Sequence, residues 1–371
     1  MSAKRVRLHI GAMKTGTTYV QGMLARNQER LALAGVLYPE PWSDQVEAVR
    51  DVMNLKGGSH LGSIKGSWPR MVGQLNDWAD SDAIISVEFL SFAKKDQVRQ
   101  ITADLAPAEV SVVLGARDLA RVLPAQWATA VRNGRTTTYR DYIEGVTRIG
   151  PSSPKKHFWN RQDVGRIARV WAQQVGPGNV TVVTVPPRGA DPTLLWQRMA
   201  EAFQIHGLEL ERTTPSNESL GPTATELLRR INLQSESMDM STWAYQHGVN
   251  RALSHKVLPG VPDPHPPLTV PEAYHNWLRT ESDRVIDEIK TSGVNVIGDI
   301  SDLDPQLEQV HPRVWPEELP TEDLLSVAVS ALTGLADKVA ADKRQQLQGG
   351  GKKRGRGRLK DNGSQAEEQA E

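Results

Sequence analysis

Residues 11–18, GAMKTGTT, bring together two glycines, one lysine and three threonines between an apolar run and a helical pattern. A glycine loop that leads from a strand into a helix directs backbone N–H groups and the positive end of the helix dipole toward a bound anion. Lys14 adds a positive charge, and Thr15, Thr17 and Thr18 add hydroxyl donors. We therefore predict an anion-binding loop at this point of the chain.

The position of the lysine distinguishes this loop from that of an ATPase. In the Walker A pattern, two glycines five positions apart are followed at once by Lys and then Ser or Thr. Gly11 and Gly16 have that spacing, but Thr17 stands where the lysine would be, and Lys14 lies inside the loop. A Mg²⁺-dependent enzyme would also need an acidic residue at the end of a neighbouring strand. Neither Glu88 nor Asp118 closes an apolar run in that manner, so we predict no metal site and keep a P-loop kinase or NTPase as the alternative.

Composition narrows the classes of function. The chain has 371 residues, a formal net charge of zero and no cysteine. The zero charge gives no bias toward nucleic acid or anionic membranes, and the missing thiols exclude disulfides and a Cys nucleophile. The N-terminal sequence lacks the apolar core of a signal peptide, and no uninterrupted apolar stretch approaches eighteen residues. The expectation is a cytoplasmic protein without a membrane span.

The first half of the chain alternates short apolar runs with helical patterns. The runs cover 5–10, 35–39, 83–89, 109–117 and 179–186, and the helical patterns cover 16–34, 69–79, 94–106, 118–133 and 162–175. Such apolar runs are typical of strands buried on both faces of a parallel sheet, and their alternation with helices indicates βαβ units. The predicted fold class is α/β, with a central parallel sheet flanked by helices and an active site at the carboxyl ends of the strands.

The second half is predicted to be mostly helical. Helical patterns follow residue 190, a proline-rich loop covers 257–271, and an amphipathic helix is predicted over 320–347. Residues 348–371 lack apolar periodicity, which predicts a disordered basic and polar tail. The predicted organisation is an α/β domain over 1–305, a helical extension over 306–347 and the tail over 348–371.

Two motifs resemble those of sulfotransferases that use 3′-phosphoadenosine 5′-phosphosulfate (PAPS), in particular bacterial proteins of the actinobacterial type. The loop of this family has the form Lys-x-Gly-Thr-Thr-aromatic, which Lys14, Gly16, Thr17, Thr18 and Tyr19 match. The second motif follows a later strand, and VVLGARDLARVLPAQW (112–127) resembles it through its Arg-Asp pair and terminal aromatic residue. The resemblance covers roughly residues 5–305 and implies a P-loop-like fold.

The resemblance also implies which residues hold the nucleotide. The 5′-phosphosulfate would be held by the loop and the 3′-phosphate by the second motif, where Ala125 replaces the usual serine and Gln126 is the candidate substitute. The segment TPSNESLG (214–221) reads as a loop and helix cap, or as a further contact to the 3′-phosphate. The candidate cofactor-binding residues are Lys14, Thr15, Gly16, Thr17, Thr18, Arg117, Gln126, Asn217 and Ser219.

Sulfuryl transfer needs a cation at the leaving oxygen and a base for the acceptor. Lys14 is the candidate for the first role, and Glu88, at the end of the strand between the two motifs, is the candidate base. His60, in a Gly-Ser loop, is the alternative base. The expected acceptor is a hydroxyl-bearing small molecule, lipid or carbohydrate. A non-catalytic nucleotide-binding protein remains the second alternative.

Overall fold

The computed structural model describes residues 4–55, 64–80, 82–205, 207–211, 220–307 and 315–357, with only the backbone described from 345 onward. The chain forms two compact units. The first unit comprises Met1–Trp127, Tyr139–Glu218 and Leu268–Arg313, and the second comprises Ala128–Thr138, Ser219–Pro267 and Val314–Glu371. The second unit therefore draws on segments on both sides of the predicted boundary at 305.

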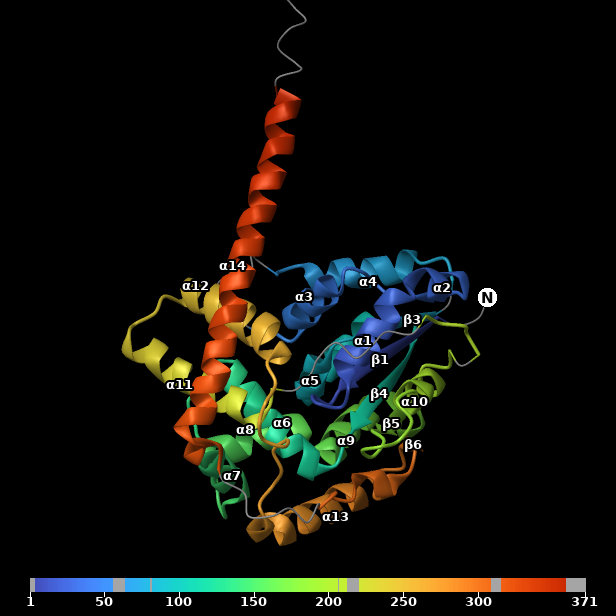
Figure 1. The fold of residues 1–371 in the computed structure, drawn as a ribbon. Helices are drawn as coiled ribbons and strands as arrows, with labels where there is room; N and C mark the ends of the chain where they lie inside the picture. Colours follow the sequence, from blue (N-terminus) through green and yellow to red (C-terminus); the bar gives the residue numbers. More distant parts are fainter. Residues whose placement is uncertain are drawn as a thin grey trace, which may run out of the picture. The chain divides into compact units, whose positions relative to one another are not determined.

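A six-stranded parallel sheet forms the centre of the first unit (Figure 1). Its strands lie in the order β2-β3-β1-β4-β5-β6, and every pair of neighbours is parallel. The strands are β1 (Arg5–Gly11), β2 (Val36–Leu37), β3 (Asp82–Ser86), β4 (Glu109–Ala116), β5 (Val180–Thr184) and β6 (Asn295–Ile297). The predicted α/β class with a parallel sheet is confirmed.

Helices cover both faces of this sheet, as is usual for a parallel sheet. Alternate residues of β1 point to opposite faces: Val6, Leu8 and Ile10 join one core cluster, whereas His9 faces Phe203 of the other. The first face packs against α3 (Trp42–Val52), α4 (Ser67–Asp77), α5 (Lys95–Asp104), α9 (Val164–Val175) and α13 (His275–Thr291). The second packs against α1 (Thr17–Arg26), α2 (Gln28–Leu33) and α10 (Leu194–Ala202).

Two element boundaries differ from the prediction. The helix expected over 16–34 is interrupted at Asn27, whose side-chain amide donates to the Met23 carbonyl at 2.8 Å. The strand expected over 83–89 ends at Ser86, and Glu88 opens the 3₁₀-helix η1 (Glu88–Phe92). Short apolar runs do not show where a strand gives way to a 3₁₀ turn, because both bury the same side chains.

Helix α6 (Leu119–Arg132) confirms the helix predicted over 118–133. The structure also contains α7 (Tyr139–Thr147), α8 (Ser153–Gln162) and the 3₁₀ turns η2 (Pro177–Asn179), η5 (Glu272–Tyr274) and η6 (Ile300–Leu303).

The second unit is helical. It contains α11 (Pro222–Ser237), α12 (Thr242–Ala244), the π-helix η3 (Tyr245–Val257), the 3₁₀ turns η4 (Leu258–Gly260) and η7 (Pro316–Glu318), and α14 (Thr321–Gly357). The predicted helix over 320–347 is confirmed, but its backbone continues to Gly357, so residues 348–357 are helical and not part of a disordered tail as predicted. The rest of the predicted tail, 358–371, lies outside the described residues. Thr321–Arg344 is long and apolar enough to cross a membrane by length and composition alone, a test that core helices of soluble proteins also pass.

Candidate active site

The predicted anion-binding loop lies at the point where the chain changes sides in the sheet. β1 has β3 on one side and β4 on the other, so the connection from β3 to β4 passes across β1. In open parallel sheets, ligands bind at the carboxyl ends of the strands near such a switch point. Lys14, Glu88 and Arg117 follow β1, β3 and β4 respectively, so three adjacent strands present them at one edge.

The backbone of the loop has an unusual conformation at two residues. Lys14 and Gly16 have positive φ values of 68° and 86°, which for Lys14 is an uncommon conformation. The loop is fixed from inside by the Thr15 hydroxyl, which donates to the Ala12 carbonyl at 2.6 Å. It is fixed to the sheet because the Ala12 N–H donates to the Gly115 carbonyl at 2.9 Å. The predicted donor Thr15 therefore uses its hydroxyl to shape the loop and can offer a ligand only its backbone N–H.

Helix α1 begins directly after the loop, as the sequence predicted. The Val20 N–H donates to the Gly16 carbonyl at 3.1 Å, and the first turn contains no acidic residue. The first N–H groups of a helix lack partners within the helix and carry its positive dipole end. Thr17 is buried and Thr18 is exposed, so of the two only Thr18 presents its side chain broadly to solvent.

Glu88 lies against the start of this loop. A Cβ atom placed on Gly11 would come within 3.0 Å of the Glu88 Cβ, which explains the need for glycine there, where φ is also positive at 95°. The half-buried Glu88 carboxylate accepts a hydrogen bond from Gln21 Nε2 of α1 at 3.1 Å. Gln21 also donates to the Ser86 carbonyl at 3.2 Å, so it links helix α1 to the end of β3 and orients the carboxylate.

Ser86 belongs to a buried network beneath Glu88. Its hydroxyl lies 2.7 Å from His9 Nδ1, and its N–H donates to Gln45 Oε1 at 2.8 Å. Trp42 Nε1 donates to the Ser86 carbonyl at 2.9 Å. Burial lowers the pKa of His9 to about 4, so this imidazole is neutral near pH 7. These hydrogen bonds hold Ser86 in place, and so they fix the start of the segment that carries Glu88.

Arg117 reaches back from the end of β4 to the loop. One of its terminal nitrogens donates to the Lys14 carbonyl at 3.1 Å, and its Nε is buried without a hydrogen-bond partner in the described part of the chain. Burial, together with the nearby charges of Arg121 and Arg188, lowers the pKa of Arg117 to about 10, while Asp118 opposes these effects. A half-buried guanidinium beside other cations and with an unused donor fits an anion.

Three other residues of the second motif, Asp118, Arg121 and Trp127, have their side chains in contacts within the fold. Asp118 is buried and binds the Arg121 guanidinium, and Arg121 also donates to the Pro186 carbonyl at 2.9 Å. An aspartate whose carboxylate binds an arginine in this way is a poor Mg²⁺ ligand. Trp127 is buried beside Tyr139, and the buried Gln126 Nε2 lacks an acceptor among the described residues.

Three of the predicted site residues lie outside the described residues, and two residues close to the site were not predicted. His60, Asn217 and Ser219 are not in the described ranges. The sequence reasoning missed Gln21 and Arg188, since a glutamine inside a helix and an arginine in a Pro-Gly loop carry no motif. Within the ranges described above, no cluster of three or more His, Asp or Glu side chains could hold a metal ion.

No family model and no curated protein matches the chain. Among solved structures, a sulfotransferase from Alicyclobacillus acidocaldarius matches with a TM-score of 0.39 and 13% sequence identity. That match covers 66% of this chain and 100% of the other.

Proposed function

We propose that the chain is a sulfotransferase, which moves a sulfuryl group from PAPS to a hydroxyl-bearing acceptor. The observation that carries the proposal is the meeting of three groups at one sheet edge. Gly11 of the loop contacts Glu88 after β3, and the Lys14 carbonyl accepts a hydrogen bond from Arg117 after β4. The loop that carries Lys14 therefore contacts both a carboxylate and an arginine with an unused donor.

In this proposal the loop binds one anionic end of the nucleotide, and Arg117 binds the other. The N–H groups at the start of α1 and the Lys14 ammonium would hold the 5′-phosphosulfate. Arg117 would hold the 3′-phosphate through the nitrogens that do not bind the loop, and Gln126 offers a further amide donor. PAPS would supply an activated sulfuryl group, whose transfer requires no metal because sulfonate carries less charge than phosphate.

The protein's own part in the reaction is positioning, charge stabilisation and one proton transfer. Lys14 would stabilise the negative charge that develops on the leaving phosphate oxygen. Glu88 would take the proton of the acceptor hydroxyl, in a position fixed by Gln21. Because the groups stand on three adjacent strands of a rigid sheet, they are oriented before the substrates arrive.

The direct test is transfer of labelled sulfate from PAPS to a panel of phenols, carbohydrates, lipids and peptides, without added metal. We expect transfer to at least one class of hydroxyl acceptor, and its loss in Lys14→Ala. Binding of PAPS without transfer to any acceptor would favour a non-catalytic nucleotide-binding protein. ATP hydrolysis that depends on Mg²⁺, without sulfate transfer, would favour the NTPase alternative.

A further inference from the structure

Helix α14 exposes a continuous apolar stripe that its own unit leaves uncovered. Its large members are more than half exposed: Leu325 is 61% exposed, Val329 54%, Leu332 65% and Val339 63%. Ala336, also exposed, completes the series. The spacings along the stripe are four, three, four and three residues, the alternation that keeps a seam facing a partner helix.

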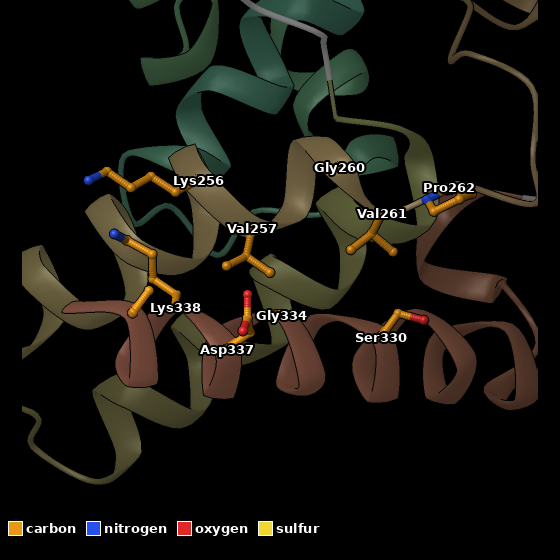
Figure 2. Close-up of a pocket in the computed structure, with 10 residues that line it drawn as sticks. Lys256, Val257, Gly260, Val261, Pro262, Ser330, Gly334, Asp337 and Lys338 are labelled. Carbon is orange, nitrogen blue, oxygen red and sulfur yellow. The ribbon is translucent and has the colours of Figure 1, made fainter. Parts of the chain in front are cut away.

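The opposite side of α14 is already occupied within the second unit. Leu324, Val327 and Ala331 are buried. Gly334 lets the helix approach η3 closely, because a Cβ there would lie 2.8 Å from Val257 Cγ1. Figure 2 shows this side of α14 facing Val257 and Val261 across a cavity of about 370 Å³. These contacts fix the rotation of the helix in its unit, so the stripe stays turned outward.

The surroundings of the stripe favour another protein helix over a lipid surface. Its flank consists of small uncharged side chains at Ser326, Thr333 and Ala340, which allow two helix backbones to approach closely. A helix that lies on an anionic membrane carries Lys and Arg along such flanks instead. The nearest charged pair, Lys338 with Asp342, is satisfied within the helix at 2.6 Å.

The charged residues at the two ends of the stripe favour a second copy of this chain as the partner. Glu322 precedes the stripe, Lys343 follows it, and both side chains are exposed. They lie ten and eleven residues from Leu332, one on either side. Two antiparallel copies centred near Leu332 would place Glu322 of one copy beside Lys343 of the other at both ends. Two parallel copies would instead bring like charges together.

We propose that α14 is a homodimerisation helix, whose apolar stripe packs against the same stripe of a second copy in antiparallel orientation. The inference is independent of the proposed function, because it uses no residue of the sulfuryl-transfer site. Isologous pairing of this kind is the usual route to a symmetric dimer.

Sedimentation equilibrium of the full chain over a concentration series tests the pairing. We expect a dimer, and a dissociation constant raised at least about tenfold by Leu332→Asp, since each dimer loses two buried leucines. Ser330→Asp, at an exposed position off the stripe, is the matched control and should leave the dimer intact. Circular dichroism should show equal helix content in both variants, because Leu332 is exposed in the single chain.

A charge exchange tests the orientation. Glu322→Lys should weaken the dimer, and Glu322→Lys combined with Lys343→Glu should restore it. A single change without effect would overturn the antiparallel arrangement. A chain that is monomeric at every concentration, or a dimer that Leu332→Asp does not weaken, would overturn the pairing itself. Flotation of a monomeric chain with phosphatidylcholine–phosphatidylserine vesicles would assign the stripe to lipid instead.

Discussion

Charged residues lie at both ends of the parallel strands, the amino edge and the carboxyl edge of the sheet, but they are paired differently. At the amino edge, the Asp82 carboxylate of β3 binds both Arg5 at 2.9 Å and Arg7 at 3.0 Å, so charged groups of opposite sign are paired with one another. Burial raises the pKa of Asp82, but the hydrogen bonds and charges of the two arginines outweigh it and lower the pKa overall. These charges are committed to one another.

At the carboxyl edge the hydrogen bonds described for Glu88 and Arg117 are with neutral partners, although Asp118 beside them binds Arg121. The Glu88 carboxylate accepts from an amide, and Arg117 donates to a backbone carbonyl. A charged side chain whose partners are neutral can still attract a charged ligand. Side chains of opposite charge that are paired with each other mainly stabilise the fold. The comparison predicts that changes at the carboxyl edge affect turnover and that changes at the amino edge affect stability.

The largest expected effect is that of Glu88→Gln on turnover. Loss of a general base typically slows a reaction by about 10²–10⁴-fold, and the isosteric amide should leave the free energy of unfolding nearly unchanged. Steady-state kinetics with PAPS and urea unfolding measure the two quantities. Glu109→Gln, at the amino edge of β4, is the control and should retain full activity. Full activity in Glu88→Gln would transfer the role of base to His60.

Asp82→Asn is expected to lower stability and to leave turnover intact. The change leaves the buried Arg7 guanidinium without its counter-charge, which should lower the free energy of unfolding by about 3 kcal/mol. The folded variant should retain its kcat and its KM for PAPS. Chemical denaturation and kinetics below the unfolding transition measure both, and a large loss of kcat with intact stability would break the contrast between the edges.

The buried His9 between the two edges predicts a pH dependence of stability. The unfolded imidazole takes up a proton below about pH 6.5 and the folded one only below about pH 4, so the unfolded state binds more protons between these values. Stability should therefore fall as the pH drops through this window, by about 3 kcal/mol for this residue. Urea unfolding of His9→Gln should show a correspondingly smaller fall, and an unchanged fall would exclude His9 as its source.

A smaller effect is expected for Gln21→Leu. Removal of a hydrogen bond to a charged group costs about 1.5–3 kcal/mol, so we expect kcat to fall roughly tenfold or more while the KM for PAPS changes little. In a Glu88→Gln background the same change should have almost no further effect on kcat, because its target carboxylate is gone. Equal losses in both backgrounds would show that Gln21 acts only through the fold.

The sequence predicted the part of this fold that depends on local pattern. The run 83–89 starts with Ala83, Ile84 and Ile85, which are apolar on both faces of a strand, a pattern typical of a buried parallel sheet, and the glycine spacing at 11 and 16 identified the loop. The sequence could not predict contacts between distant segments. Nothing near Gln21 indicates that it reaches Glu88, and the hydrogen bond from Arg117 to the loop depends on β4 lying beside β1. Such contacts follow from strand order, which periodicity does not encode.

The central claim is that the carboxyl edge is built for a bisphosphorylated nucleotide and not for a metal–triphosphate complex. Isothermal titration calorimetry with 3′-phosphoadenosine 5′-phosphate (PAP) and with ATP, each with and without Mg²⁺, tests it most directly. We predict that PAP binds without Mg²⁺ and that ATP binds weakly under both conditions. Tight ATP binding that requires Mg²⁺, together with no binding of PAP, would contradict the account.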